Sequence, residues 1–162
     1  MDNNFDTLFL DRDGVINYKI ENEYVKSICE FKFIPDFIHV VKDLSLLFNR
    51  IIIITNQQGI GKGLMSISDL NEIHEHMLNT INHNNGRIDK IYYCPHLDSD
   101  NCICRKPSPG MIYKACKEFN INPQKSIIIG DKESDIRAGI SANIAKCIYF
   151  GCAKYISIME IS

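Results

Sequence analysis

The feature that most constrains the fold is a set of apolar runs that each end abruptly in polar residues. Three runs have this form: residues 7–10 before Asp11, residues 51–54 before Thr55, and residues 127–129 before Gly130. The second and third runs consist entirely of isoleucine. Uninterrupted β-branched runs of this length are typical of strands buried on both faces of a parallel sheet. They predict three central strands, with weaker candidates at residues 91–93 and 145–150.

Segments with helical periodicity separate the expected strands. We expect helices to begin at Pro35, which suits a first turn, at Ser68, which can act as a cap, and at Ser108 and Ser134. Alternating strands and helices favour an α/β fold, a three-layer Rossmann-like parallel sheet with helices on both faces. No repeat or linker divides the 162 residues, so we expect a single domain, 1–162, with no large cap domain and a small flap at residues 18–33.

Composition limits the partners that the chain can have. Lys and Arg number 18 and Asp and Glu number 20, which gives a net charge of −2. This balance argues against a protein that binds nucleic acid or anionic membranes by bulk charge. The N-terminus lacks the basic and apolar regions of a signal peptide, and no apolar run approaches the roughly 20 residues that span a bilayer. We therefore expect a cytoplasmic monomer with no nucleic-acid or membrane partner.

The seven cysteines are an odd number, which excludes a fully paired set of intramolecular disulfides. Three of them and one histidine fall within eleven positions, in a loop at about 94–106: Cys94, His96, Cys102 and Cys104. Three sulfurs and one imidazole match a closed tetrahedral Zn²⁺ site, which would be structural because no coordination position stays open. The alternative is a polar loop with incidental cysteines, since four others have no assigned role: Cys29, Cys116, Cys147 and Cys152.

Carboxylates follow two of the expected strands. Asp11 and Asp13 lie two positions apart, so in an extended chain both face one site while Arg12 points elsewhere. Asp131 and Asp135 follow another strand, and the carboxyl ends of parallel strands meet at the edge where ligands bind. Converging carboxylates repel one another unless a cation lies among them, and hard oxygen ligands favour Mg²⁺. The alternative is that each aspartate only forms a turn or caps a helix.

The order of these polar segments resembles the four motifs of the haloacid dehalogenase superfamily. The matching segments are Asp11-Arg12-Asp13-Gly14, Thr55-Asn56-Gln57, Arg105-Lys106-Pro107, and Gly130-Asp131 through Ser134-Asp135. The resemblance spans about residues 6–150 and implies a phosphatase that works through an aspartyl-phosphate. It implies that Asp11 is the nucleophile and that Asp13 is the general acid and base. We expect a crowded anionic site to raise the pKa of Asp13, as an acid near neutral pH requires.

The same resemblance implies which groups hold the metal and the substrate. Mg²⁺ would bind the Asp11 carboxylate, the Asp13 backbone carbonyl and Asp131. A small phosphorylated sugar would bind five residues of the motifs: Thr55, Asn56, Arg105, Lys106 and Lys132. In this scheme Thr55 donates to a phosphoryl oxygen, Lys106 adds a point charge, and Arg105 reads the distal end of the substrate. The zinc loop would position Arg105 and Lys106, which directly follow Cys104.

Within the superfamily, the zinc loop marks a branch that contains two groups of phosphatases. Most segments, among them residues 14–17, 55–63 and 105–111, resemble phosphatases that remove the C7 phosphate of D-glycero-D-manno-heptose 1,7-bisphosphate for surface polysaccharide biosynthesis. The five-residue gap between His96 and Cys102 instead resembles the histidinol-phosphate phosphatases of histidine biosynthesis. We expect the heptose activity, with the histidinol activity as the alternative, because loops tolerate deletions readily.

Two rival classes of protein fit less well. Residues 59–63 contain glycines and a lysine, but they lack the spacing and the Ser or Thr of a nucleotide-binding P-loop. The other rival is a non-catalytic zinc module that binds a protein or a nucleic acid. The near-neutral charge and the complete catalytic set argue against it.

Overall fold

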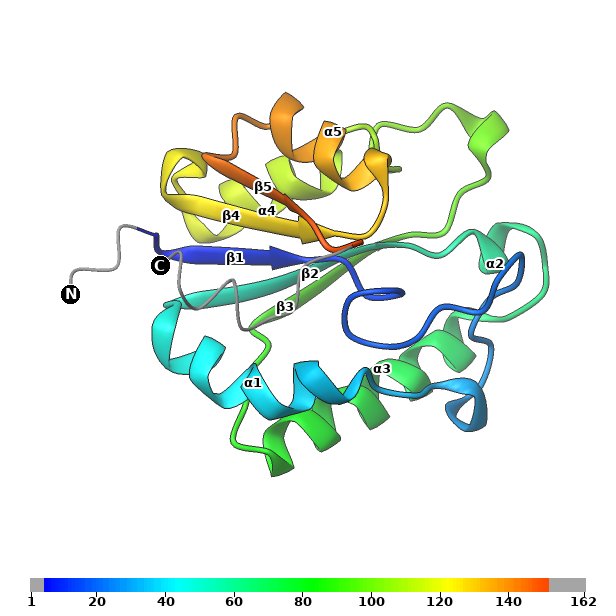
Figure 1. The fold of residues 1–162 in the computed structure, drawn as a ribbon. Coiled ribbons are helices and arrows are strands. Elements are labelled where there is room, and N and C mark those ends of the chain that lie inside the picture. The colour runs from blue at the N-terminus through cyan, green and yellow to red at the C-terminus, as the bar shows by residue number, and fades with distance from the viewer. Residues whose placement is uncertain (1–4, 152–162) are drawn as a thin grey trace.

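Five parallel strands form one sheet in the order β3-β2-β1-β4-β5 (Figure 1). The strands are β1 (Thr7–Leu10), β2 (Arg50–Asn56), β3 (Lys90–Cys94), β4 (Ser126–Gly130) and β5 (Lys146–Tyr149). The three central strands and both weaker candidates are therefore confirmed. The computed structural model describes residues 5–151, so the expectations for residues 1–4, for Cys152 and for the ends of the domain lie outside it.

Four longer helices cover the two faces of the sheet (Figure 1). They are α1 (Pro35–Leu47) and α3 (Ile67–His83) on one face, and α4 (Gly110–Phe119) and α5 (Glu133–Ser141) on the other. Ile51 and Ile53 of β2 pack into the core that α1 and α3 cover. Ile52 and Ile54 pack into the core that α4 and α5 cover. Because successive strand residues face opposite layers, the uninterrupted isoleucine run is explained, and the three-layer fold is confirmed.

The shorter elements connect this framework. They are the helix α2 (Gln58–Gly61) and the 3₁₀ turns η1 (Ile28–Glu30), η2 (Asp98–Asp100) and η3 (Pro123–Lys125). No separate cap domain lies among residues 5–151. None of the helices in this range is long and apolar enough to cross a membrane.

The cap expected at Ser68 is wrong, whereas the helices expected at Ser108 and Ser134 begin within two residues of those positions. Ser66 caps α3 instead, because its Oγ accepts from the backbone N–H of Asp69 at 3.0 Å. The Asp69 carboxylate accepts in turn from the backbone N–H of Ser66 at 2.7 Å. The helix α4 follows Pro109 and α5 follows Lys132. A serine caps a helix only where its hydroxyl reaches a free N–H of the first turn, and Ser66 and Ser68, two residues apart, left that choice open for α3.

The register brings the polar ends of three strands to one edge. Leu10 of β1 pairs with Ile53 of β2 and with Ile129 of β4. The chain extends the sheet from β1 in one direction through β2 and β3, and in the other through β4 and β5. The reversal of strand order therefore lies beside Asp11, where open α/β sheets bind their ligands. The loop of residues 18–33, which contains η1, lies at the same edge (Figure 1).

Candidate active site

A pocket of about 750 Å³ opens at this edge of the sheet. The loop at residues 18–33 supplies one wall and the segment from Arg105 to Pro107 supplies another. Five cationic side chains line the pocket: Lys19, Lys62, Arg105, Lys106 and Lys132. Four acidic side chains line it as well: Asp13, Glu21, Glu23 and Asp98. These walls suit a polar, anionic ligand, because fixed cations can pair with its charge.

Lys106 joins Asp11 to Asp135 at the centre of the site. Its Nζ donates to Asp11 Oδ1 at 2.8 Å, lies 2.7 Å from Asp135 Oδ1, and donates to the carbonyl of Ile54 at 2.8 Å. Burial alone would lower the pKa of Lys106, but the two carboxylates raise it above its usual value. Burial raises the pKa of Asp11, although Lys106 opposes that rise. Lys106 is therefore a fixed cation beside the expected nucleophile.

Asp131 presents a buried oxygen with no hydrogen-bond partner. Its Oδ2 accepts from Lys19 Nζ at 2.7 Å, while its Oδ1 is the unpartnered atom. Oxygens of Asp11, Asp131 and Asp135 lie within 4.8 Å of one another. Gly14, with φ at +92°, allows this close approach because a Cβ there would collide with the Asp131 carboxylate. An unpartnered buried oxygen among clustered carboxylates fits a hard divalent cation such as Mg²⁺.

Asp13 differs from the sequence-based expectation in its electrostatics. Burial would raise the pKa of Asp13, but Arg12, followed by hydrogen bonds from Asn17 and Gln57, holds it below its usual value. The expected rise is therefore wrong for the unliganded site. Its physical reason is that Arg12 does not turn away from its neighbour, since Arg12 NH2 donates to Asp13 Oδ1 at 2.9 Å. Repulsion among the carboxylates, on which the expected rise rests, is outweighed by these contacts.

Thr55 and Asn56 end β2 beside this cluster, but their side chains have different contacts. Thr55 Oγ1 accepts from Gln57 Nε2 at 2.9 Å and is buried near the site. Asn56 contacts the backbone of Lys106 twice: Oδ1 accepts from its N–H at 3.0 Å, and Nδ2 donates to its carbonyl at 3.0 Å. The side chain of Asn56 therefore holds the segment that carries Lys106.

Arg105 and Lys132 lie on the pocket wall, as a role in substrate binding requires. Arg105 Nε donates to Asp98 Oδ1 at 2.9 Å, and NH2 donates to Gln58 Oε1 at 3.2 Å. The third guanidinium nitrogen, NH1, is buried and has no hydrogen-bond partner. An unpaired donor on the wall of a polar pocket is suited to an acceptor on a ligand.

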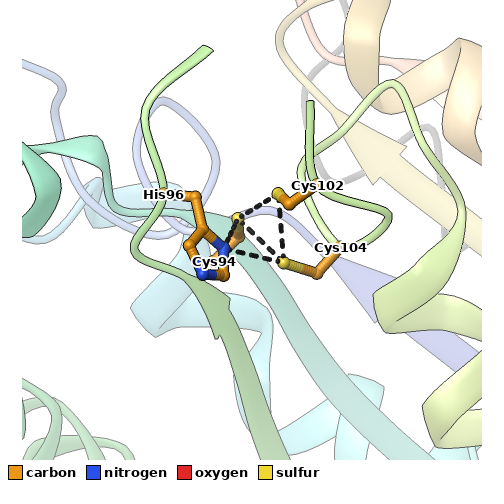
Figure 2. Close-up of side chains that lie close together, drawn as sticks. All are labelled: Cys94, His96, Cys102 and Cys104. Carbon is orange, nitrogen blue, oxygen red and sulfur yellow. Dashed lines mark hydrogen bonds between the residues drawn. The ribbon is translucent and has the colours of Figure 1, made fainter. Parts of the chain in front are cut away.

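The four expected zinc ligands converge in space, as Figure 2 shows. They are Cys94 and His96, at and after the end of β3, and Cys102 and Cys104, after η2. Five of the six separations between their Sγ and Nδ1 atoms are 3.1–3.5 Å. Tetrahedral zinc with Zn–S bonds of ~2.3 Å sets sulfurs about 3.8 Å apart. The cluster is therefore compatible with zinc after a small expansion, and the six cysteines within residues 5–151 are free of disulfides.

Several residues of the site were not assigned from the sequence: Lys19, Tyr24, Gln57, Gln58 and Lys62. Gln57 and Gln58 directly follow Thr55-Asn56, so their position beside a motif was an available signal. Lys19 is 112 residues from its partner Asp131, and no local pattern identifies such a contact. Asp135 was placed among the converging carboxylates but was given no partner, and the structure pairs it with Lys106.

The parallel sheet and the aspartates at its carboxyl edge define a hydrolase of one family. The family model of haloacid dehalogenase-like hydrolases matches residues 15–149, and the chain belongs to that family. The superfamily and fold expected from the sequence are confirmed.

The names of individual similar proteins give a narrower activity than the family does. The chain is 39% identical over 138 residues to a D-glycero-beta-D-manno-heptose-1,7-bisphosphate 7-phosphatase of Helicobacter pylori strain J99, covering 85% of this chain and 78% of that protein. It is 42% identical over 141 residues to a D-glycero-alpha-D-manno-heptose-1,7-bisphosphate 7-phosphatase of Campylobacter jejuni, covering 87% and 80%. The crystal structure of a D,D-heptose 1,7-bisphosphate phosphatase from B. bronchiseptica, complexed with magnesium and phosphate, has a TM-score of 0.85 and 29% identity, covering 94% of this chain and 87% of that one.

Proposed function

We propose that this hydrolase removes the C7 phosphate of D-glycero-D-manno-heptose 1,7-bisphosphate. The observation that carries the proposal is the buried pair of Asp11 and Lys106 close to the unpartnered oxygen of Asp131, next to a pocket that Lys106 and four further cationic side chains line. The activities named for the relatives in Helicobacter pylori and Campylobacter jejuni support the choice of substrate. The product would keep its anomeric phosphate, the group that nucleotide activation of a sugar needs.

Asp11 and Asp13 divide the chemistry between them. Asp11 attacks phosphorus in line, forming an aspartyl-phosphate as the bond from phosphorus to the C7 oxygen breaks. Asp13 donates a proton to that departing oxygen and later takes one from the water that hydrolyses the intermediate. This releases inorganic phosphate and restores Asp11. The pKa of Asp13 is low before substrate binds, and an adjacent phosphate dianion would raise it, so the acid forms with substrate in place.

Fixed charges and hydrogen-bond donors would stabilise the phosphoryl group during transfer, because this reaction depends mainly on positioning and charge stabilisation. Lys106 places its ammonium group beside Asp11, and Thr55 donates its hydroxyl to a phosphoryl oxygen. Mg²⁺ bound by the Asp11 carboxylate, the Asp13 backbone carbonyl and Asp131 would neutralise phosphoryl charge. The unpartnered Oδ1 of Asp131 supports this ligand set.

In this proposal the zinc loop holds the segment that contacts the far end of the substrate. NH1 of Arg105 offers a donor to the distal phosphate, and Lys132 adds a cation on the pocket wall. Zinc bound by Cys94, His96, Cys102 and Cys104 would hold the segment that carries Arg105 and Lys106. Zinc has a structural role here because its four protein ligands leave no open position.

Phosphate release from purified protein with Mg²⁺ tests this function. The wild type should release one phosphate per heptose 1,7-bisphosphate and leave the 1-phosphate intact, and Asp11→Asn should abolish release while circular dichroism shows an unchanged fold. Full activity in Asp11→Asn would refute the nucleophile. Absence of release by the wild type would refute the proposed substrate.

Two further substrates make the same assay discriminating. Histidinol phosphate tests the alternative that the short gap between His96 and Cys102 favours, and faster turnover of it would replace the heptose assignment. Both anomers of the bisphosphate are compared because the two relatives act on opposite anomers.

A further inference from the structure

A buried polar network lies behind the pocket and links helix α3 to Asp13. Arg12 has no exposed surface, and its guanidinium lies between two side chains. NH2 donates to Asp13 Oδ1 at 2.9 Å, and NH1 is 3.2 Å from Nε2 of His74. The centre of the Phe31 ring is 5.9 Å from the guanidinium carbon. The Nε of this buried cation has no hydrogen-bond partner, so each contact that the other two nitrogens make has a structural consequence.

His74 is the part of this network that the proposed chemistry does not use. It lies on α3, is 7% exposed and is not among the residues that line the pocket. Burial, with a smaller effect from Arg12, lowers the pKa of His74 to about 3. The ring is therefore neutral at physiological pH, and Nε2 accepts a hydrogen bond from Arg12. His74 does not line the pocket, and its ring contacts one end of the Arg12 guanidinium.

The contacts of Asp13 are unequal on its two oxygens. Oδ1 accepts from Arg12 NH2 at 2.9 Å and from Asn17 Nδ2 at 2.9 Å, which uses both of its acceptor sites. Oδ2 accepts only from Gln57 Nε2 at 2.9 Å. The same Nε2 lies 2.9 Å from Thr55 Oγ1, on the side expected to hold the phosphoryl group. Oδ2 therefore keeps one acceptor site free, and a proton taken up by Asp13 belongs on Oδ2.

We propose that His74 and Arg12 are positioning residues that orient Asp13 for proton transfer. His74 fixes the guanidinium of Arg12, and Arg12 together with Asn17 occupies Oδ1, which directs the proton to Oδ2. This inference rests on the proposed function, in which Asp13 is the general acid and base. Arg12 and His74 are 62 residues apart in sequence, in the segment after β1 and in the middle of α3.

A leaving-group comparison separates positioning from general structural support. A sugar alkoxide leaves only with a proton from Asp13, whereas nitrophenolate leaves readily without one. The quantity kcat/KM reports the steps up to leaving-group departure. We expect His74→Leu to lower kcat/KM for heptose 1,7-bisphosphate by about tenfold or more, out of the 10²–10⁴-fold that general acid catalysis typically supplies. For p-nitrophenyl phosphate the same variant should stay within about threefold of the wild type, since that step needs no acid.

Rescue and control variants complete the experiment. His74→Gln carries an amide oxygen that can accept from Arg12 and should recover most of the lost kcat/KM on the heptose substrate. His83 lies on the exposed end of the same helix, and His83→Leu should leave kcat/KM unchanged for both substrates. His74→Asn keeps a polar side chain but is shorter, and it replaces His74→Leu if circular dichroism shows that the leucine variant does not fold.

The outcomes separate this inference from the proposed function. Equal losses on both substrates, unchanged kcat/KM for the heptose substrate in a folded His74→Leu or His74→Asn, or no recovery in His74→Gln would each overturn the positioning role. If the wild type hydrolyses only the sugar phosphate, the positioning role is tested on that substrate alone. It stands if His74→Leu lowers kcat/KM and His74→Gln recovers it, and it fails otherwise. A wild type that releases no phosphate from the heptose substrate refutes the proposed function instead.

Discussion

Three carboxylates at the edge of the sheet have three different cationic partners, and the partner determines what each can do. Asp11 shares Lys106 with a second carboxylate, Asp13 is paired with its chain neighbour Arg12, and Asp131 is paired with Lys19. Burial raises the pKa of Asp11 and of Asp131. Burial acts in the same direction at Asp13, but Arg12 together with hydrogen bonds from Asn17 and Gln57 brings the pKa of Asp13 below its usual value. Three aspartates in one cluster therefore differ in how readily they bind a proton, because their immediate contacts differ.

The buried histidine makes stability depend on pH. The groups that face His74 are Arg12, Asp13 and the ring of Tyr93, and burial lowers the pKa of His74 to about 3, so it stays neutral in the folded protein. In the unfolded chain it gains a proton below its ordinary pKa of about 6.5, so stability is complete above that pH and falls as the pH drops toward 3. We expect the wild type to lose about 2 kcal/mol more than His74→Gln between pH 7 and pH 5 in urea unfolding. Parallel losses in both proteins would contradict this account.

At the scale of elements, the start of α3 depends on one serine and not its neighbour. The reciprocal hydrogen bonds between Ser66 and Asp69 cap the helix, and neither of them involves Ser68. We expect Ser66→Ala to lower the free energy of unfolding by about 1 kcal/mol, because a free N–H of the first turn loses its acceptor. Ser68→Ala is the matched control and should change it by less than about 0.5 kcal/mol. Equal effects of the two substitutions in urea unfolding would show that Ser66 has no special role.

The loop that carries Cys94, His96, Cys102 and Cys104 leads directly into Lys106, so zinc bound there would be linked to the position of that lysine. Cys104 directly precedes Arg105 and Lys106, so a change in the loop reaches the nucleophile's partner within two residues. We expect Cys102→Ala to bind less zinc, to unfold at a lower temperature and to lose at least about tenfold in kcat/KM, because structural zinc sites contribute folding energy. Zinc content, thermal unfolding and phosphate release are measured together, with the exposed Cys29→Ala as control. A variant of Cys102 that has lost zinc but keeps full turnover would refute the positioning role of the loop.

At the scale of the whole molecule, the sheet gathers negative charge that the fold by itself leaves partly unbalanced. Oxygens of Asp11, Asp131 and Asp135 lie within 4.8 Å of one another at the end of the central strands. A divalent cation that binds only the folded protein should stabilise all of it by mass action. We expect Mg²⁺ at about 100 times its Kd to raise the free energy of unfolding by about 2.7 kcal/mol. Asp131→Asn should lose most of this increase, whereas Asp36→Asn, on the exposed side of α1, should keep it. An identical increase in Asp131→Asn would place the cation elsewhere.

The sequence by itself determined the layers of the fold and the edge of the sheet at which the site lies. Isoleucine runs predicted the buried strands because a strand covered on both faces needs apolar residues at every position. The polar residues that end those runs predicted the edge where the site lies, because parallel strands place their carboxyl ends together. The converging cysteines and histidine were likewise identified from spacing alone. These features are carried by neighbouring residues, and local patterns therefore reveal them.

Only the tertiary structure decided which side chains face one another. Lys19 meets Asp131 across 112 residues, and Arg12 meets His74 across 62. Even Arg12 and Asp13, adjacent in sequence, were expected to point apart, and they contact because the buried guanidinium has to find acceptors. Those contacts reversed the expected shift in the pKa of Asp13. A side chain's charge and orientation depend on partners that folding brings from distant segments, whereas the strands that carry it depend on the residues beside them.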